Sequence, residues 1–427
     1  MCMTFMLQMQ CTTRSAVLTN AVMSHGTDIP DFSSEFVQYA EDNVDHNIRT
    51  LDGTNTFHGM GMIAAITPAT KTSRPTLRAQ VTSSDISTVG RIPIQYHKED
   101  SRGTTTMAYQ KVVNMKAKDP TADLDLLWKT SVMFTSPRPA WSGLMQLVYH
   151  GDHPGKTSVM FLPMIDMNPS DVTCIYSTLK FVCEHARRHG VKPIITFDQT
   201  LWWKALVIIE TEPTGSVLND MLLRLGGFHT EMSFLGSIGH LMAGSGRQEV
   251  LELIYADNAV VHMMSGKAIA RAVPEHLLVD AALNALILSD ALGVPLPKPS
   301  ADPHEVEETN EATVSPDDEP TTNGTGNTDL DESAALYKNL MKGSVSAEEF
   351  CQADVLTRIK KLLQAQTESL KSSRTATLWL QYMEMVDILR KIIRAEHIGN
   401  WALHLKAVSE MLPYLAASGL NLYTKSI

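Results

Sequence analysis

The sequence is poor in cysteine, and its cysteines are not spaced for a zinc knuckle or a disulfide framework. Five cysteines are spread over 427 residues, and no C-x-x-C pair occurs. An odd number of scattered cysteines is typical of a reducing compartment. We therefore expect an intracellular protein without structural disulfides.

Long apolar runs are missing as well. No stretch of about 18 consecutive apolar residues occurs, which argues against a membrane span. The Met-rich start, residues 1–10, has no basic residue ahead of its apolar core, so it is a poor secretory signal. The sequence therefore predicts no membrane partner.

A broad excess of basic charge is also absent. The net charge is −11, and residues 301–332 carry eleven acidic residues with no Lys or Arg. The rest of the chain is therefore neutral, without the basic field that marks many nucleic-acid binders. A small, local basic groove is still compatible with this neutral total charge. The acid-, Pro- and Thr-rich composition of residues 293–332 predicts a disordered insertion.

Three familiar sequence signatures are not found. There is no G-x-x-x-x-G-K-[ST] phosphate loop, no G-x-S-x-G nucleophile elbow and no internal repeat. These absences exclude a P-loop nucleotide hydrolase, a typical α/β-hydrolase and a solenoid.

The first third of the chain predicts short strands separated by loops. A strand at 36–40 runs toward Asp42, and a partner strand with glycines follows at 56–66. Further short elements are expected as strands at 91–97 and 147–149 and as a helix at 124–128.

A strand–helix–strand pattern begins near residue 158. We expect strands at 158–165, 193–197 and 221–225 and helices after Ser170, at 201–209 and at 230–242. Pro163 indicates an edge strand or a bent one, and Ser170 is the expected N-cap. Strands joined through helices predict a locally parallel sheet.

Helical patterns occupy most of the rest, at 247–292 and again at 333–418. We divide the chain into an irregular segment 1–34, an α/β core with a helical extension 35–292, an acidic linker 293–332 and a helical region 333–427.

Three acids stand at comparable places in these elements. Asp42, with Asp45 as its alternative, ends an early strand, and Asp198 ends a strand of the parallel part. Glu231 opens a later helix. This order is the pattern of ribonuclease-H-like phosphoryl-transfer enzymes. The predicted class is therefore α/β, with a ribonuclease-H-like mixed sheet core, large helical regions and the acidic insertion.

Such acids suit divalent-metal chemistry. Mg²⁺ and Mn²⁺ prefer carboxylate oxygens, and two such ions can clamp the attacking and leaving oxygens of a phosphodiester. Asp42, Asp45, Asp198 and Glu231 are the candidate metal ligands, and His229 is the candidate that orients the nucleophile or leaving group.

Structural interpretations stand beside these. Asp198 also fits a plain helix N-cap, and Glu231 also fits a favourable charge in a first helical turn. Gly226-Gly227 also fits a simple strand-to-helix turn. A metal hydrolase is a third alternative, built on three histidines: His58, His229 and His240.

Two other groups of residues favour structural roles. His185 and His189 are four residues apart, but they end a helix beside Arg187 and Arg188, which is typical of a solvated cationic terminus. The glycines between 236 and 246 are spaced for close helix packing.

Several runs resemble an uncharacterised protein family, a domain of unknown function associated with transposable elements. The motifs that carry the resemblance are D-N-x-D-H-N from Asp42, F-D-Q from Phe197 and G-G-F-H from Gly226, with a terminal A-A-x-G-L-x-x-Y that ends at Tyr423. The resemblance spans residues 36–423 and implies a mobile-element origin. It implies Asp42, Asp198, His229 and Glu231 as motif residues.

The resemblance also implies that the last acid of such a site can follow a helical insertion, which keeps Glu396 and Glu410 as alternatives. We expect a transposon-derived nuclease or transposase that acts on DNA, active or decayed, with Mg²⁺ or Mn²⁺. A nuclear location and a homo-oligomer are further expectations. The alternative is a non-enzymatic interaction or DNA-tethering protein.

Overall fold

The computed structural model of the chain describes residues 36–47, 56–67, 92–98, 117, 119, 121–148, 157–297, 324–345 and 347–427. The chain divides into two compact units, each built from separate stretches of sequence. Unit 1 comprises Met1–Asn114, His153–Ser237 and Leu412–Ile427, and unit 2 comprises Met115–Asp152 and Ile238–Met411.

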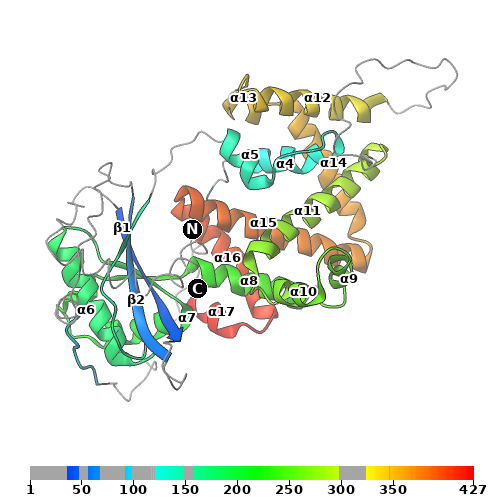
Figure 1. The fold of residues 1–427 in the computed structure, drawn as a ribbon. Helices are drawn as coiled ribbons and strands as arrows, with labels where there is room; N and C mark the ends of the chain where they lie inside the picture. The colour runs from blue at the N-terminus through cyan, green and yellow to red at the C-terminus, as the bar shows by residue number, and fades with distance from the viewer. Residues whose placement is uncertain are drawn as a thin grey trace. The chain divides into compact units, whose positions relative to one another are not determined.

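Unit 1 contains a five-stranded mixed sheet with helices, so the predicted α/β class is confirmed. The strands follow the order β3-β2-β1-β4-β5; β1, β2 and β3 are antiparallel neighbours, whereas β4 and β5 run parallel to β1. Its elements are β1 (Phe36–Asn47), β2 (Thr56–Thr67), β3 (Ser158–Phe161), α6 (Val172–Arg188), β4 (Ile194–Phe197), α7 (Gln199–Thr211), η2 (Val217–Asp220), β5 (Leu222–Leu225), the start of α8 (Gly227–Leu241), and α17 (Asn421–Ser426) (Figure 1).

The central strand β1 pairs with β2 along its whole length, from Phe36 beside Thr67 to Asn47 beside Thr56. Alternate side chains of β1, including Val37 and Tyr39, are buried in the core. That burial follows from the period of two along a strand, which sends every second side chain to the same face.

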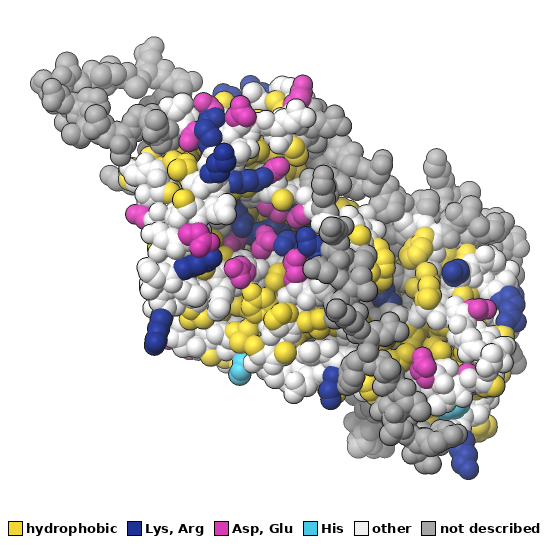
Figure 2. Space-filling model, turned by 180° about the vertical axis from the view of Figure 1, so that it is seen from behind, with side chains coloured by type: hydrophobic (Ala, Val, Ile, Leu, Met, Phe, Trp, Pro, Cys, Tyr) yellow, Lys and Arg dark blue, Asp and Glu magenta, His cyan; other side chains and the backbone are white. Residues whose placement is uncertain are grey.

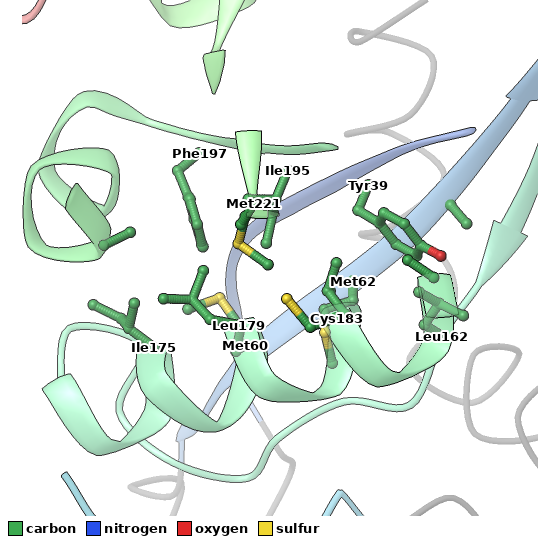
Figure 3. Close-up of a cluster of buried hydrophobic side chains, with 14 of the residues drawn as sticks. Tyr39, Met60, Met62, Leu162, Ile175, Leu179, Cys183, Ile195, Phe197 and Met221 are labelled. Atoms are coloured by element: carbon green, nitrogen blue, oxygen red, sulfur yellow. The ribbon is translucent and has the colours of Figure 1, made fainter. Parts of the chain in front are cut away.

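Helix α6 supplies the opposite wall of this core. Figure 3 shows Ile175, Leu179 and Cys183 of α6 directed toward Ile195 and Phe197 of β4. Each of these side chains is almost completely buried. Full burial of an apolar side chain of this size contributes about 1.5–3 kcal/mol to folding.

Local signals explain where the helices of unit 1 begin and end. The Asp171 carboxylate accepts a hydrogen bond from the Thr173 amide at 2.7 Å and caps α6, so the N-cap is Asp171 and not the predicted Ser170. Gly190 ends the helix with φ +66°, which glycine adopts without strain. Strand β3 is an edge strand, as Pro163 predicts.

All regular secondary structure in the described residues of unit 2 is helical. It contains α4 (Ala122–Thr130), η1 (Ser131–Met133), α5 (Trp141–Val148), the end of α8, α9 (Arg247–Glu252), α10 (Asp257–Met264), α11 (Ile269–Leu292), α12 (Gly324–Met341), α13 (Ala347–Cys351), α14 (Asp354–Leu370), α15 (Arg374–Ile398) and most of α16 (Trp401–Ala417). Helix α11 contacts α4, α10, α12, α14 and α15, so it forms the centre of this unit.

Buried ion pairs join the helices of unit 2. The Asp280 carboxylate of α11 lies 2.5 Å from Arg390 of α15 and 2.9 Å from Lys129 of α4. Arg394 lies within 2.7 Å of Asp119 and 2.5 Å of Asp125. Opposite charges placed this closely offset the cost of removing each of them from water.

Among the described helices, α11 alone is long and apolar enough to cross a membrane by length and composition. Its 18-residue window has a mean hydropathy of 1.3 and is 56% buried inside the protein. The helix also holds Glu275 and Asp280 in buried ion pairs. A mostly buried helix with buried charged side chains has the character of a core helix.

Three further sequence predictions are wrong. Residues 92–98 have no regular secondary structure where a strand was expected, and the Gln95 amide donates instead to Ser177 Oγ at 2.9 Å. Leu147 and Val148 end helix α5 and are not a strand. Residues 324–332 of the predicted linker are helical in α12, and residues 298–323 lie outside the described residues.

Candidate carboxylate site

Strands β1 and β4 bring two of the predicted acids to the same level. The parallel register places Tyr39 beside Ile195 and Ala40 beside Thr196. The pairing ends at Ala40 and Thr196; two residues beyond it, the same register would set Asp42 level with Asp198. Asp42 therefore lies within β1 and not at its end, whereas Asp198 directly follows β4.

The alternation of side chains along β1 and β4 assigns both acids to one face of the sheet. Gln38 Nε2 donates to Thr196 Oγ1 at 2.6 Å, so these two side chains lie on the same side. Asp42 and Asp198 each follow by an even number of residues, and Asp198 keeps an extended backbone with ψ 171°. The period of two along a strand then directs both carboxylates to that side.

A cation extends this polar face onto β5. Arg224 lies beside Thr196 in the β4–β5 register and donates from Nη1 to Gln38 Oε1 at 3.0 Å. Gln38 of β1 thus forms hydrogen bonds with side chains of both β4 and β5. Neither Gln38 nor Arg224 could be predicted from the sequence, because no local pattern marks a hydrogen bond between residues 186 positions apart.

Asp198 also has a structural role. Its Oδ1 accepts from the Leu201 amide at 2.8 Å and caps α7, so the N-cap interpretation is confirmed. The cap engages one of the two carboxylate oxygens. A role as a ligand is compatible with it, because the other oxygen has its own lone pairs.

Gly226 brings α8 close to the end of β4. Its amide donates to the Phe197 carbonyl at 2.7 Å, and a Cβ at this position would lie 2.9 Å from that oxygen. Helix α8 begins at Gly227, so Glu231 lies one turn inside the helix and does not open it. His229 is in the first turn, with its ring 5.4 Å from that of Phe228.

The C-terminal helix α17 packs beside the same region. Gln199 Nε2 at the start of α7 donates to Ser426 Oγ at 3.1 Å. Burial raises the pKa of the Tyr423 phenol, and the negative charge of the Asp198 carboxylate raises it further. A hydrogen bond with Ser233 lowers the same pKa. The charge of Asp198 therefore acts on Tyr423. The sequence marked Tyr423 only as part of a terminal motif.

The acid that precedes Asp42 has a different environment. Glu41 is buried in the core, and neither of its carboxylate oxygens has a hydrogen-bond partner within the described structure. Burial raises the pKa of Glu41 well above its usual range. Strand β1 therefore carries one core carboxyl and, one residue later, a carboxyl on the polar face.

The described part of the structure assembles no larger metal site from the other predicted residues. Within the described residues, no group of three or more His, Cys, Asp and Glu side chains is placed to hold a metal ion. The side chains of Asp45 and His58 lie outside the described part of the structure, and His240 is exposed at the far end of α8. Both helical alternatives have partners in unit 2: Glu396 pairs with His404, and Glu410 with Lys391.

Surface charge gives no simple sign of a partner. Figure 2 shows one face of the protein, on which basic and acidic side chains are interspersed and not separated by sign. This agrees with the neutral balance of the sequence outside its acidic segment.

Comparison with known proteins identifies a family and no activity. Residues 140–427 match the family model described as Domain of unknown function (DUF8702). No curated protein and no solved structure matches the chain. The matched region contains Asp198, His229 and Glu231 but not Asp42. The match covers more than half of the chain, so the protein belongs to the DUF8702 family.

Proposed function

We propose that unit 1 is a ribonuclease-H-like core in which Asp42 and Asp198 hold a divalent metal ion for phosphoryl transfer on DNA. The observation that supports the proposal is the β1–β4 register, which, extended two residues past the Ala40–Thr196 pair, sets these two acids level with each other. Neighbouring carboxylates at adjacent strand positions are the kind of ligand pair that Mg²⁺ and Mn²⁺ prefer.

The order of the elements supports the fold part of the proposal. The central strand β1 is followed by its antiparallel partner β2 and by the edge strand β3, which pairs with β2; β4 and β5 then lie on the other side of β1 and parallel to it, with helices after β3, β4 and β5. The early hairpin with an acid and the later parallel strand that ends on an acid are the two features expected of a ribonuclease-H-like core.

Two protein carboxylates are sufficient for this chemistry. Mg²⁺ is commonly held by one or two carboxylates, with waters and substrate phosphates in its other positions. Glu231, one turn into α8, is the sequence-based candidate for a third acid, although it forms no three-residue metal site with Asp42 and Asp198 among the described residues. His229, in the turn before it, is the residue we assign to orienting the attacking water or the leaving group. The bound metal supplies charge neutralisation on the phosphate.

A mobile-element origin is part of the same proposal. It rests on the resemblance of the motifs at Asp42, Phe197 and Gly226 to sequences associated with transposable elements. Action on chromosomal DNA would place the protein in the nucleus.

The decisive experiment compares the purified full chain with Asp198→Asn. Asparagine caps a helix about as well as aspartate, so this variant keeps the cap of α7 and removes the charge. We expect Mn²⁺- or Mg²⁺-dependent nicking of plasmid DNA by the wild-type protein. The variant should lose at least about a hundredfold, because losing a ligand should cost more than the roughly 10–100-fold typical of losing a partner that only orients a ligand. Asp220→Asn, at an exposed acid of the same unit, is the control. Equal nicking by wild type and Asp198→Asn would reject the assignment.

A non-enzymatic interaction or DNA-tethering role is the second candidate. The observation that favours it is that no third acid joins Asp42 and Asp198 among the described residues. Metal-independent DNA binding without nicking, unchanged in Asp198→Asn, would support this role and contradict the first.

A further inference from the structure

Helix α11 carries an exposed ridge that folding of unit 2 leaves uncovered. The ridge consists of Arg271, Pro274, Leu278, Ala282, Leu286 and Asp290, all exposed and three or four residues apart. Leu278 is 56% exposed and Leu286 is 51% exposed. Residues spaced in this way line one side of a helix.

The rest of α11 does not share this exposure. Leu277, Ala281 and Leu288 are buried in unit 2, as are the charged side chains of Glu275 and Asp280. The helix is therefore held firmly from behind by apolar contacts and ion pairs. Its exposed side is a fixed surface with an apolar middle.

The ridge is complementary to the same ridge of a second copy that runs antiparallel to it. Two copies of α11 packed antiparallel about position 280 would place Leu278 opposite Ala282 and Pro274 opposite Leu286. The basic end, Arg271, would then come within one position of the acidic end, Asp290, of the other copy. A surface that matches itself under a twofold rotation is the requirement for an isologous dimer.

We propose that this ridge is the contact between two copies of the chain in a homodimer. Opposite charges at its two ends favour an antiparallel copy and disfavour a parallel one, since a parallel copy would bring like charges together. The inference does not depend on the proposed activity of unit 1.

Other occupants match the ridge less well. From Pro274 to Leu286 the apolar part spans about 18 Å at 1.5 Å per residue, well short of the roughly 30 Å of a bilayer core, and it is bounded by charges. The acidic segment 298–323 contains no Leu, Ile, Met or aromatic residue with which to cover two leucines.

The first test measures the mass of the full chain in solution over a concentration series, by light scattering and sedimentation velocity. We expect a concentration-dependent dimer for the wild type. Leu278→Asp should weaken it at least about a hundredfold, because both copies then place a charge in the contact. Leu253→Asp is the matched control, since Leu253 is 85% exposed and lies outside the ridge. Circular dichroism establishes that both variants are folded.

A charge exchange tests the antiparallel arrangement. Arg271→Glu and Asp290→Lys should each weaken the dimer, and the double variant should restore it to near the wild-type value. A monomeric wild type, a dimer that resists Leu278→Asp, or binding of the wild type to anionic lipid vesicles in place of dimerisation would overturn the proposal. The proposal would also be overturned if each single charge variant weakened the dimer and the double variant weakened it by the sum of the two effects.

Discussion

The phenolic oxygen of Tyr39 and Nδ1 of His185 lie 2.8 Å apart in a buried hydrogen bond that joins the central strand β1 to helix α6. His185 was expected at a solvated cationic helix end, yet it is only 3% exposed. Burial lowers the pKa of His185 to about 4, and the charges of His189 and Arg188 act in the same direction. The native state therefore keeps this imidazole neutral.

The first prediction follows from that neutral imidazole. Below a pH of about 6.5 the unfolded chain takes up a proton that the native state refuses, so the free energy of unfolding falls as the pH drops from about 6.5 to about 4. The loss attributable to His185 is at most about 3 kcal/mol. Urea titrations of wild type and His185→Gln at several pH values measure it. The free energy of unfolding should depend differently on pH in the two proteins only between about pH 4 and pH 6.5. Parallel pH profiles would contradict a neutral, buried His185.

Glu41 leads to a prediction of opposite sign. Its folded-state pKa is raised, so above a pH of about 4.5 the unfolded chain releases a proton that the native state keeps, and stability falls as the pH rises. Glu41→Gln removes this dependence. We expect its stability relative to wild type to grow by about 1 kcal/mol or more between pH 5 and pH 8. Glu184→Gln, at an exposed site on α6, is the charge-matched control and should show no such growth.

The buried pair of Arg247 and Glu275 allows a double-mutant test in unit 2. Arg247 Nη2 lies 2.6 Å from Glu275 Oε2, and both side chains are almost completely buried. Arg247→Met leaves a buried carboxylate without its cation and should cost about 3–5 kcal/mol. Arg247→Met combined with Glu275→Met should recover much of that loss, because no charge is then left unpaired. Chemical denaturation measures both values, and a double variant no more stable than the single one would contradict this explanation.

Gly239 supports a prediction about close packing. A Cβ at this position would lie 1.9 Å from the Met264 carbonyl oxygen, so the backbone of α8 or α10 would have to move. Gly239→Ala should destabilise the protein by about 1–3 kcal/mol or more. Gly143→Ala is the matched control: its Cβ would lie 3.6 Å from that of Pro139, and it should gain up to about 1 kcal/mol from helix propensity. Thermal unfolding compares the two, and equal effects would refute the packing role.

Much of the local structure could be predicted from the sequence. The pairing of 36–40 with 56–66, the cap at Asp198 and the long C-terminal helices are confirmed, because alternation, capping residues and helical periodicity are local signals. The strand predicted at 147–149 is wrong, since a short apolar run does not distinguish a strand from a helix end. The close packing predicted for the glycines is confirmed at Gly239, whereas Gly246 instead has φ +90°.

The candidate site could be predicted only in part. Asp42 and Asp198 follow from their places in strands, but their common level depends on which strand pairs with β1 and in which register. The hydrogen bond between Gln199 of α7 and Ser426 of α17 joins residues 227 positions apart. Such contacts arise from tertiary packing, and a single sequence has no local pattern that reports them.

The division of unit 1 into three stretches of sequence has a consequence for synthesis on the ribosome. The hairpin of β1 and β2 emerges first, the parallel strands β4 and β5 follow, and the helix beside Asp198 emerges only after all of unit 2. At about 5–20 residues per second, the nascent sheet exists for many seconds without its last helix. During that time Asp198 and its neighbours on α7 are more open to water and to chaperones than in the finished protein.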